Sequence, residues 1–225
     1  KRHRKSQRFL RRLNMFTGII QATSSVVSVS ERGGVKRTRI RKPTRWKLIK
    51  GQSVAIDGIC STVVELGAGW FEVEYMPETL SKTTARSLAR GHSVNLERSL
   101  RYGDPIDGHL MQGHVDSRAR IMAVTRKGRS REIRVALPQV LAKKVARHGS
   151  VALNGVSLTV ARVRRGAFEV ALIPHTLSHT NLGGLSVGDS VNMEVDRIVL
   201  LADLSARGKV SRNAKKRGRK KHKTS

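Results

Sequence analysis

The chain has 225 residues, 38% hydrophobic and 27% charged, which is enough to fill one large or two small cores and excludes a wholly disordered chain. Its one cysteine, Cys60, excludes an internal disulfide framework, and its longest apolar run, near 198–202, is far shorter than the roughly 20 residues of a membrane-spanning helix. The formal net charge of +29 favours contact with polyanions such as RNA.

Two short terminal segments hold more than half of this excess charge. Residues 1–14 carry seven basic and no acidic side chains, and residues 201–225 carry ten basic and one acidic. Such runs are usually solvated arms that seek polyanions. RNA or ribosome contact is one interpretation, and a plain solvated tail is the other. For the first segment, a gene start at Met15 and a weak organelle-targeting signal also stay open.

Between these segments the sequence repeats itself. Shifting residues 53–97 by 97 positions aligns them with residues 150–194 and gives 21 identities in 45 ungapped positions. Chance would give only a handful, so the chain contains a duplicated unit, and the fold must be built from two similar halves.

Each half predicts short β-strands separated by turns. The expected strands, in chain order, lie at 53–56, 62–64, 70–74, 151–153, 158–160 and 168–171. Phe71, Val73 and Tyr75 alternate with polar residues, as in a half-buried strand. Asp57-Gly58 and Asn154-Gly155 are two-residue turn signals.

Other short connections complete the pattern in both halves. Hairpin loops are expected at 67–69 and 164–166, and short helices are expected to begin at 77–80 and 174–177. Many short strands punctuated by glycine indicate two small closed barrels, which leave no exposed sheet edge.

A series of motifs carries a family resemblance. The segments, in order, are MFTGII at 15–20, GICSTV at 58–63, PETL at 77–80, VNLER at 94–98, GHLMQGHVD at 108–116, NGVSLTV at 154–160, IPHTL at 173–177 and VNMEVD at 191–196. Together they resemble the riboflavin synthase family over roughly residues 15–200. Several motifs in order over a real duplication are more specific than any one of them.

The resemblance implies an all-β fold of two tandem, homologous, six-stranded Greek-key barrels that bind lumazine, plus a short C-terminal helix. The expected domains are the basic tail 1–14, the first barrel 15–108, the second barrel 109–196, the helix 197–207 and the basic tail 208–225. It further implies a cytoplasmic homotrimer without metal or organic cofactor, with sites between the first barrel of one subunit and the second barrel of a neighbour.

The implied reaction is the exchange of a four-carbon unit between two molecules of 6,7-dimethyl-8-ribityllumazine, which gives riboflavin and 5-amino-6-ribitylamino-pyrimidinedione. Two like substrates fit two like pockets, which hold them in reacting register. The chemistry needs a base for an acidic methyl group, an acceptor for negative charge and a group that assists a nucleophile.

Site residues follow from the family motifs. The resemblance assigns catalytic roles to Cys60, His114, Ser157 and Asp196, and substrate contacts to Phe16, Thr17, Ser53, Thr62, Asn154, Thr159 and Thr176. Each also has a structural interpretation: Cys60 and Phe16 as core residues, His114 and Asp196 as capping groups, and the hydroxyls as ordinary strand residues. His109 and His114 lack a third ligand in the sequence, so we expect no metal site.

Three positions depart from the family pattern. Asn154 stands where aspartate is common, Asp57 where asparagine is common, and Ser61 where leucine is usual. If the aspartate that is common at this position transfers a proton, asparagine at 154 lowers the rate. If that aspartate only hydrogen-bonds the substrate, asparagine can take its place.

Two other functions stay open beside the enzyme. The charge favours a related chain recruited to RNA or the ribosome, and the same fold suits a carrier of flavin or lumazine. A basic stretch from Lys36 to Lys47 is required by no step of lumazine chemistry.

Overall fold

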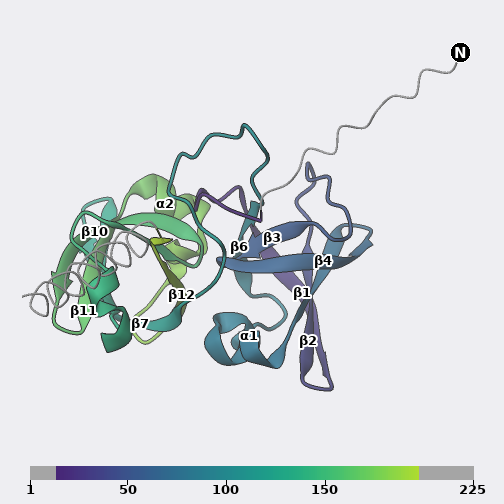
Figure 1. The fold of residues 1–225 in the computed structure, drawn as a ribbon, viewed down its shortest axis with the longest axis horizontal. Coiled ribbons are helices and arrows are strands. Elements are labelled where there is room, and N and C mark those ends of the chain that lie inside the picture. The colour runs from purple at the N-terminus through teal and green to yellow at the C-terminus, as the bar shows by residue number, and fades with distance from the viewer. Residues whose placement is uncertain (1–13, 198–225) are drawn as a thin grey trace, which may run out of the picture.

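The structure is a computed structural model that describes residues 14–197 (Figure 1). Within this range the chain forms two closed, six-stranded antiparallel barrels that lie side by side. The predicted basic tails and the predicted helix 197–207 lie outside the described residues, apart from Asn14 and Arg197.

The first barrel follows the strand order β1-β2-β5-β4-β3-β6. Its elements are β1 (Ala22–Arg32), β2 (Val35–Arg41), β3 (Ser53–Ile56), β4 (Ile59–Gly67), β5 (Trp70–Tyr75), α1 (Pro77–Lys82), the 3-10 helix η1 (Thr84–Ser87) and β6 (Ser93–Arg98). Strands β3, β4 and β5 form a meander. Because β2 pairs with β5 and β6 pairs with β3 at the two sides of this meander, the barrel has the expected Greek-key order.

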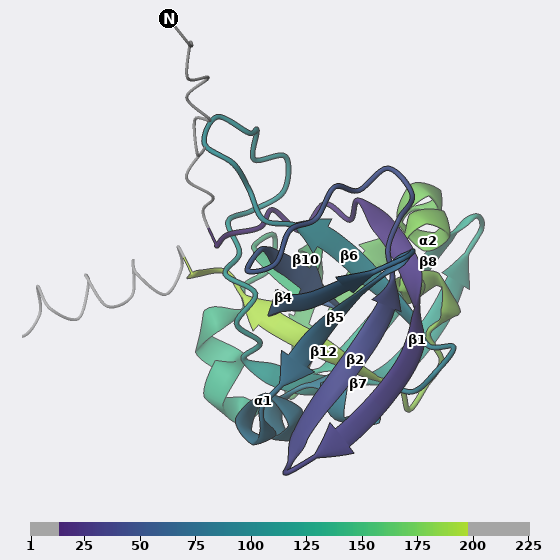
Figure 2. The ribbon, with the colours of Figure 1, turned by 90° about the vertical axis from the view of Figure 1, so that its right-hand side faces the viewer.

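The second barrel repeats this order with equivalent strands. Its elements are β7 (Ser117–Lys127), β8 (Ser130–Ala136), the 3-10 helix η2 (Gln139–Lys144), β9 (Ser150–Leu153), β10 (Val156–Arg164), β11 (Ala167–Leu172), α2 (Pro174–His179), the 3-10 helix η3 (Asn181–Gly184) and β12 (Ser190–Val195). Within residues 14–197, no helix has the length and apolar character to cross a membrane. Figure 2 shows the strands of both barrels from the side of β1 and β2.

The predicted two-residue turns are confirmed in both barrels. Asp57 and Gly58 have φ angles of 46° and 75°, and Asn154 and Gly155 have 45° and 76°. Positive φ at both central residues matches the right-handed twist of the flanking strands, and Asp, Asn and Gly tolerate it best. The strand β4 starts at Ile59, three residues earlier than predicted, and β10 starts at Val156, two residues earlier. Both strands start early because they pair with their neighbours directly from the turn.

Each barrel encloses its own hydrophobic core. Phe71 and Val94 are fully buried in the first core, and their equivalents Phe168 and Val191 are fully buried in the second. Each buried Phe or Val contributes about 1.5–3 kcal/mol relative to an exposed side chain. Two separate cores explain why each half of the repeat carries a complete set of apolar positions.

The turn tips join the two barrels. A Cβ atom added to Gly58 would lie 2.7 Å from the backbone nitrogen of Gly155, and the reverse contact is the same. The Asn95 side chain donates to the Asn154 carbonyl oxygen at 2.9 Å, and Asn192 donates to the Asp57 carbonyl oxygen at 2.9 Å. The barrels therefore meet through reciprocal contacts between equivalent residues, as a molecular two-fold arrangement requires.

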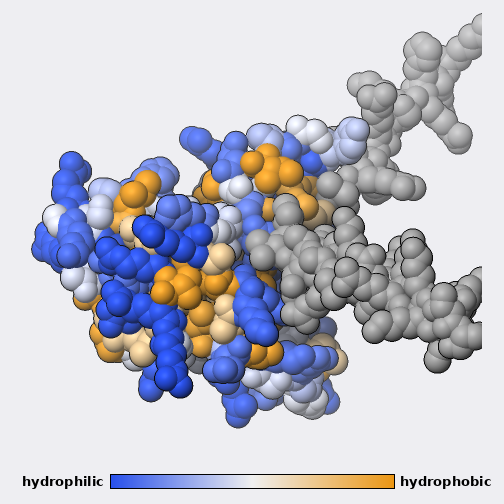
Figure 3. All heavy atoms as spheres, turned by 60° about the vertical axis from the view of Figure 1, so that its left-hand side comes forward, coloured by the Kyte–Doolittle hydropathy of each residue, from blue (hydrophilic) through white to orange (hydrophobic). Residues whose placement is uncertain are grey.

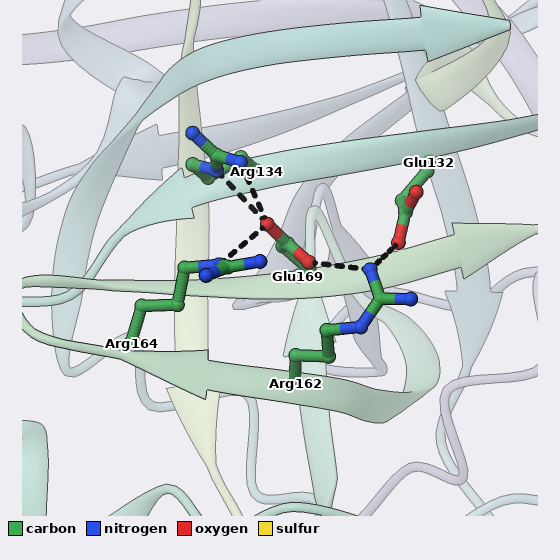
Figure 4. A network of polar contacts seen from close by, with 5 residues as sticks. All are labelled: Glu132, Arg134, Arg162, Arg164 and Glu169. Carbon is green, nitrogen blue, oxygen red and sulfur yellow. Dashed lines mark hydrogen bonds and ion pairs between the residues drawn. The ribbon is translucent and has the colours of Figure 1, made fainter.

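Arginines surround a buried carboxylate on the outer wall of the second barrel (Figure 4). Glu169 of β11 accepts hydrogen bonds from Arg134, Arg162 and Arg164 at 3.0–3.1 Å. Burial alone would raise the pKa of Glu169, but these bonds outweigh it and lower the pKa to about 2. Glu169 is therefore ionised at neutral pH, and its hydrogen bonds tie β8, β10 and β11 together.

Candidate functional site

The two repeats open with short segments that pair with each other between the barrels. Phe16 and Met111 form an antiparallel bridge with N–O distances of 2.9 Å in both directions. Both side chains are buried in a small third core with Ala55 of β3, Ala152 of β9 and the half-buried Cys60. Phe16, predicted to contact substrate, therefore packs at the centre of the molecule beside Cys60.

Beyond this bridge the opening segments cross to the opposite barrels. The carbonyl oxygen of Gly18 accepts a hydrogen bond from the Ser157 N–H, and that of Gly113 accepts one from the Cys60 N–H, both at 2.9 Å. A Cβ atom added to Gly18 would lie 2.6 Å from the Ser157 Cβ, and one added to Gly113 would lie 2.8 Å from the Cys60 Cβ. Cys60 and Ser157 are equivalent positions, so each repeat positions the candidate reactive side chain of the other.

Two buried glutamates hold these crossing segments. Glu97 of β6 accepts hydrogen bonds from the Thr17 N–H at 2.7 Å, the Thr17 hydroxyl at 2.8 Å and the Gly18 N–H at 3.0 Å. Glu194 of β12 accepts the equivalent bonds from the N–H groups of Gln112 at 2.9 Å and Gly113 at 3.0 Å. Both the N–H and the hydroxyl of Thr17, a residue predicted to contact substrate, therefore donate to Glu97.

Burial shifts the pKa of both glutamates upward. It raises the pKa of Glu194 to about 7 and that of Glu97 above its usual range, although hydrogen bonds from backbone N–H groups oppose it. Sequence reasoning missed both as positioning residues. The signal was present, because Asn-x-Glu recurs at 95–97 and 192–194.

The Cys60 thiol is half-buried beside the small third core. Burial raises its pKa above the ordinary value, and this outweighs a hydrogen bond with Ser53. The Ser53 hydroxyl also donates to the side-chain oxygen of Asn14 at 3.1 Å. The structure thus brings the predicted residues Cys60 and Ser53 together, with the thiol protonated near neutral pH, which suits a hydrogen-bonding group better than a thiolate nucleophile.

Ser157 has a different partner from Cys60. Its hydroxyl lies 2.7 Å from Nδ1 of His109, a buried histidine in the segment between the barrels. Burial lowers the pKa of His109, which the negative charge of Asp196 partly offsets. A neutral imidazole beside a hydroxyl can accept its proton, so the geometry is that of a serine–histidine pair.

His109 is a residue whose role sequence reasoning missed. The sequence indicates His109 only as half of a weak metal pair with His114, because its contact with Ser157 joins residues 48 positions apart in the chain. Its Nε2 atom is buried and has no hydrogen-bond partner among residues 14–197.

The other predicted residues lie around these two centres. Thr62 and Thr159 are exposed at equivalent places in β4 and β10, paired in register with Ser53 and Ser150. His114 is exposed, and its carbonyl oxygen accepts a 3.4 Å hydrogen bond from Arg197.

Two predicted contact residues are engaged in backbone support. The backbone oxygen of Thr176 in α2 accepts the Thr180 hydroxyl at 2.7 Å. Asn154 is buried, and its side chain accepts from the Asn192 N–H at 2.8 Å and donates to Asn181 at 3.3 Å. The Asn154 side chain is therefore occupied at the joint between the barrels.

Exposed apolar side chains stand at equivalent positions of the two repeats. Met76 and Ile173 precede α1 and α2, and 56% and 57% of their surfaces are exposed. Met76 directly follows β5, and Ile173 directly follows β11, the strands that pair with β4 and β10. Sequence reasoning missed this pair, although both stand directly before the repeated Pro-x-Thr-Leu motif.

The described residues contain no cluster of three or more histidine, cysteine, aspartate or glutamate side chains that could hold a metal ion. The polar groups gathered here suit proton transfer and hydrogen bonding to an organic substrate.

Comparison with known proteins places both barrels in one domain family. A family model described as the lumazine binding domain matches residues 17–99 and 112–196. A riboflavin synthase from Brucella abortus is 41% identical over 194 residues, which cover 84% of this chain and 96% of that protein. Riboflavin synthases from Mycobacterium tuberculosis and Escherichia coli are 38% and 37% identical, covering 81% of this chain and 93% and 87% of theirs.

Solved structures share the fold. LumP complexed with 6,7-dimethyl-8-(1'-D-ribityl) lumazine superposes with a TM-score of 0.73 at 22% identity, covering 80% of this chain and 98% of that one. LumP complexed with riboflavin gives a TM-score of 0.76 at 23% identity over the same shares of the two chains.

Proposed function

The chain belongs to the riboflavin synthase family, and from that premise we propose that it converts two molecules of 6,7-dimethyl-8-ribityllumazine into riboflavin and 5-amino-6-ribitylamino-pyrimidinedione. Four carbon atoms pass from one lumazine to the other, and the exchange balances without an oxidant or reductant. The observation that carries the proposal is the pair of equivalent positions, Cys60 and Ser157, each held by the opening segment of the other repeat.

The reaction begins with loss of a proton from an acidic methyl group of one lumazine. The pair of His109 and Ser157 supports this step, because a neutral imidazole 2.7 Å from the hydroxyl can take its proton while the hydroxyl takes the proton of the methyl group. The negative charge of Asp196 stabilises the positive charge that His109 gains when it takes this proton. His114, exposed nearby in the chain, is the second candidate to move protons.

The other barrel supplies a centre for the second lumazine. The protonated Cys60 thiol and the Ser53 hydroxyl offer hydrogen bonds, and Thr62 and Thr159 offer hydroxyls on the exposed faces of their strands. The apolar side chains of Met76 and Ile173 would cover the ring systems. Two equivalent sites held in register lower the entropic barrier between two identical substrates.

We propose a homotrimer in which a first barrel faces the second barrel of a neighbour. Exposed apolar residues of the second barrel support self-association, and Figure 3 shows hydrophobic patches between hydrophilic side chains on one face. Analytical ultracentrifugation tests this directly, and a monomer at micromolar concentration would contradict it.

A cytoplasmic location and activity without a metal or organic cofactor complete the proposal. The single cysteine is a free thiol, which fits a reducing compartment. Cell fractionation tests the location. Unchanged turnover after dialysis against a chelator tests metal independence.

The deciding experiment is a turnover assay that follows riboflavin formation from the lumazine. We expect His109→Ala and Ser157→Ala each to lower kcat about 100-fold or more, with trimer and fold intact. His92→Ala, an exposed histidine of the first barrel, is the matched control and should keep its activity. Binding of lumazine without turnover in the native chain would favour the carrier function instead.

RNA or ribosome binding in place of catalysis is not supported by the family relationship. The basic tails on which that alternative rests, 1–14 and 208–225, lie outside the described residues apart from Asn14. Binding of nucleic acid through these tails stays compatible with catalysis, and deleting them should weaken salt-sensitive binding while sparing turnover.

A further inference from the structure

A groove of about 590 Å³ lies at the seam between the two barrels, and neither Cys60 nor Ser157 lines it. Lys82 of α1 lines it from the first barrel, and Arg118 and Arg120 of β7 line it from the second. The lining also includes the hydroxyl-bearing Ser190 of β12 and the exposed Val140 of η2. Nothing in lumazine chemistry uses these residues.

The charge of the groove is positive and mostly uncompensated. Lys82 pairs with Glu78 at 2.7 Å, and Asp116, the acidic residue of the lining, pairs with Arg197 at 3.2 Å. Within residues 14–197, neither Arg118 nor Arg120 has a carboxylate within 4.0 Å. Both arginines are exposed, and Nε of Arg120 donates to the Gly188 carbonyl oxygen at 3.4 Å. Two cationic side chains without a carboxylate partner therefore border this concave surface.

The equivalent positions of the first barrel carry no charge. Arg118 pairs in register with Asn192, as Thr23 pairs with the equivalent Asn95. Arg120 pairs with Ser190, as Ser25 pairs with the equivalent Ser93. Because the same barrel wall forms with Thr and Ser, the fold does not require arginine here.

The arrangement of the two arginines fits a phosphate chain. Residues two apart on a strand leave the same face about 7 Å apart, which is comparable to the spacing of successive phosphates in an extended single strand. Guanidinium groups bind phosphate oxygens with two parallel hydrogen bonds, and the groove adds a serine hydroxyl and the Lys82 ammonium group. We propose that this seam groove binds the phosphodiester backbone of a single-stranded nucleic acid.

The test is fluorescence anisotropy of a labelled oligouridine with the full chain at several salt concentrations. Arg118→Thr with Arg120→Ser installs the side chains of the first barrel. We expect about a tenfold weaker affinity and a salt slope smaller by about 1.4, because two phosphate contacts are lost. Turnover of lumazine should be unchanged.

The control removes the same charge elsewhere. Arg126→Ser with Arg129→Ser lies at the exposed tip of the β7–β8 hairpin, outside the groove. We expect a clearly smaller loss of affinity for this variant. Equal losses in the two variants, or no loss in the groove variant, would overturn the proposal, because binding would then depend on overall charge alone.

A second readout locates the nucleic acid. Ultraviolet cross-linking of the oligouridine followed by mass spectrometry should label peptides that contain α1 or the start of β7. Labels confined to peptides without groove residues would also overturn the proposal.

Discussion

The two barrels share one topology, yet their walls carry different charges at equivalent positions. In the first barrel, Glu72 pairs with one arginine, Arg39, at 2.7 Å, and that arginine also lies over the Trp70 ring. In the second barrel, the equivalent Glu169 is surrounded by three arginines. Shifting by 97 positions replaces Glu65 by Arg162, so the charge at that position is reversed.

Several positions that join the halves stay identical in the two repeats. Asn95 and Asn192, and the turn glycines Gly58 and Gly155, make reciprocal contacts across the molecule. Glu97 and Glu194 each hold the opening segment of their own repeat, which in turn contacts the other barrel. A contact between equivalent residues constrains both copies, whereas a solvent-facing wall residue constrains neither. The comparison teaches that the joint is fixed by geometry while the walls were free to diverge in charge.

The largest expected effect breaks the crossing of the opening segments. Gly18→Ala and Gly113→Ala should each cost about 3 kcal/mol in free energy of unfolding, because positive φ and a clash with the opposite strand add up. Gly69→Ala is the control, since its φ is +80° but a Cβ there meets nothing within 4 Å. Urea unfolding measures all three, and equal costs would show that the crossing contact contributes nothing.

The next effect tests a titratable difference at the turns that join the barrels. Burial raises the pKa of Asp57 to about 7, whereas its equivalent, Asn154, is neutral. The unfolded state ionises near 3.8 and the folded state near 7, so stability falls as pH rises between these values. Asp57→Asn should remove this loss, with a gain over the native chain that reaches a few kcal/mol at pH 8 and vanishes at low pH.

Unfolding in urea at pH 5 and pH 8 checks this prediction, and a gain that is the same at both values would contradict it. Asn154→Asp is the mirror variant and should lose stability as pH rises, because its carboxylate would face the side-chain oxygen of Asn181. The same variant tests the expectation from the family pattern that an acid at 154 keeps or raises turnover.

The outer walls give a smaller contrast. Glu169→Gln should cost about 2 kcal/mol, because three arginines lose a buried carboxylate partner, and Glu72→Gln should cost about 1 kcal/mol for one. The arginines are about half exposed, so solvent screens much of the interaction. Thermal unfolding compares the two variants, and equal losses would mean that the extra arginines add no stability.

The smallest effect lies on the two short helices. The ion pair Glu78–Lys82 of α1 has its equivalent in α2 in the stacked rings of His175 and His179, 4.1 Å apart. His175→Glu with His179→Lys should change stability by less than about 0.5 kcal/mol at neutral pH. If this double variant shifted the thermal midpoint more than Glu169→Gln does, the helix contact would matter more than the arginine cluster, and the prediction would be wrong.

Much of the fold was predictable because its signals are local. The turn pairs Asp57-Gly58 and Asn154-Gly155 predicted hairpins that the structure confirms, and the identities at a shift of 97 predicted two like halves. The strands β4 and β10 start earlier than the sequence predicts, because Ile59 and Val156 pair directly at the turn. Apolar and polar residues do not alternate there, so the sequence has no strand signal at these positions.

The candidate site was predictable only in part. The family motifs singled out Cys60 and Ser157 as candidate catalytic residues, and the structure brings Ser53 to Cys60. It could not be inferred that His109 would contact Ser157, because this distance depends on how the segment between the barrels folds back. Met76 and Ile173 were missed because exposure is not written in the sequence.

The sequence by itself determined the duplication, the hairpins, the family and the excess of positive charge, since each of these follows from residue types at fixed spacings. Only the tertiary structure decided that each opening segment crosses to the other barrel, that Ser157 meets a neutral histidine, and that Arg118 and Arg120 line a seam. The physical reason is the same in all three cases. They depend on contacts between residues far apart in the chain, whose closeness is set by the packing of two barrels against each other.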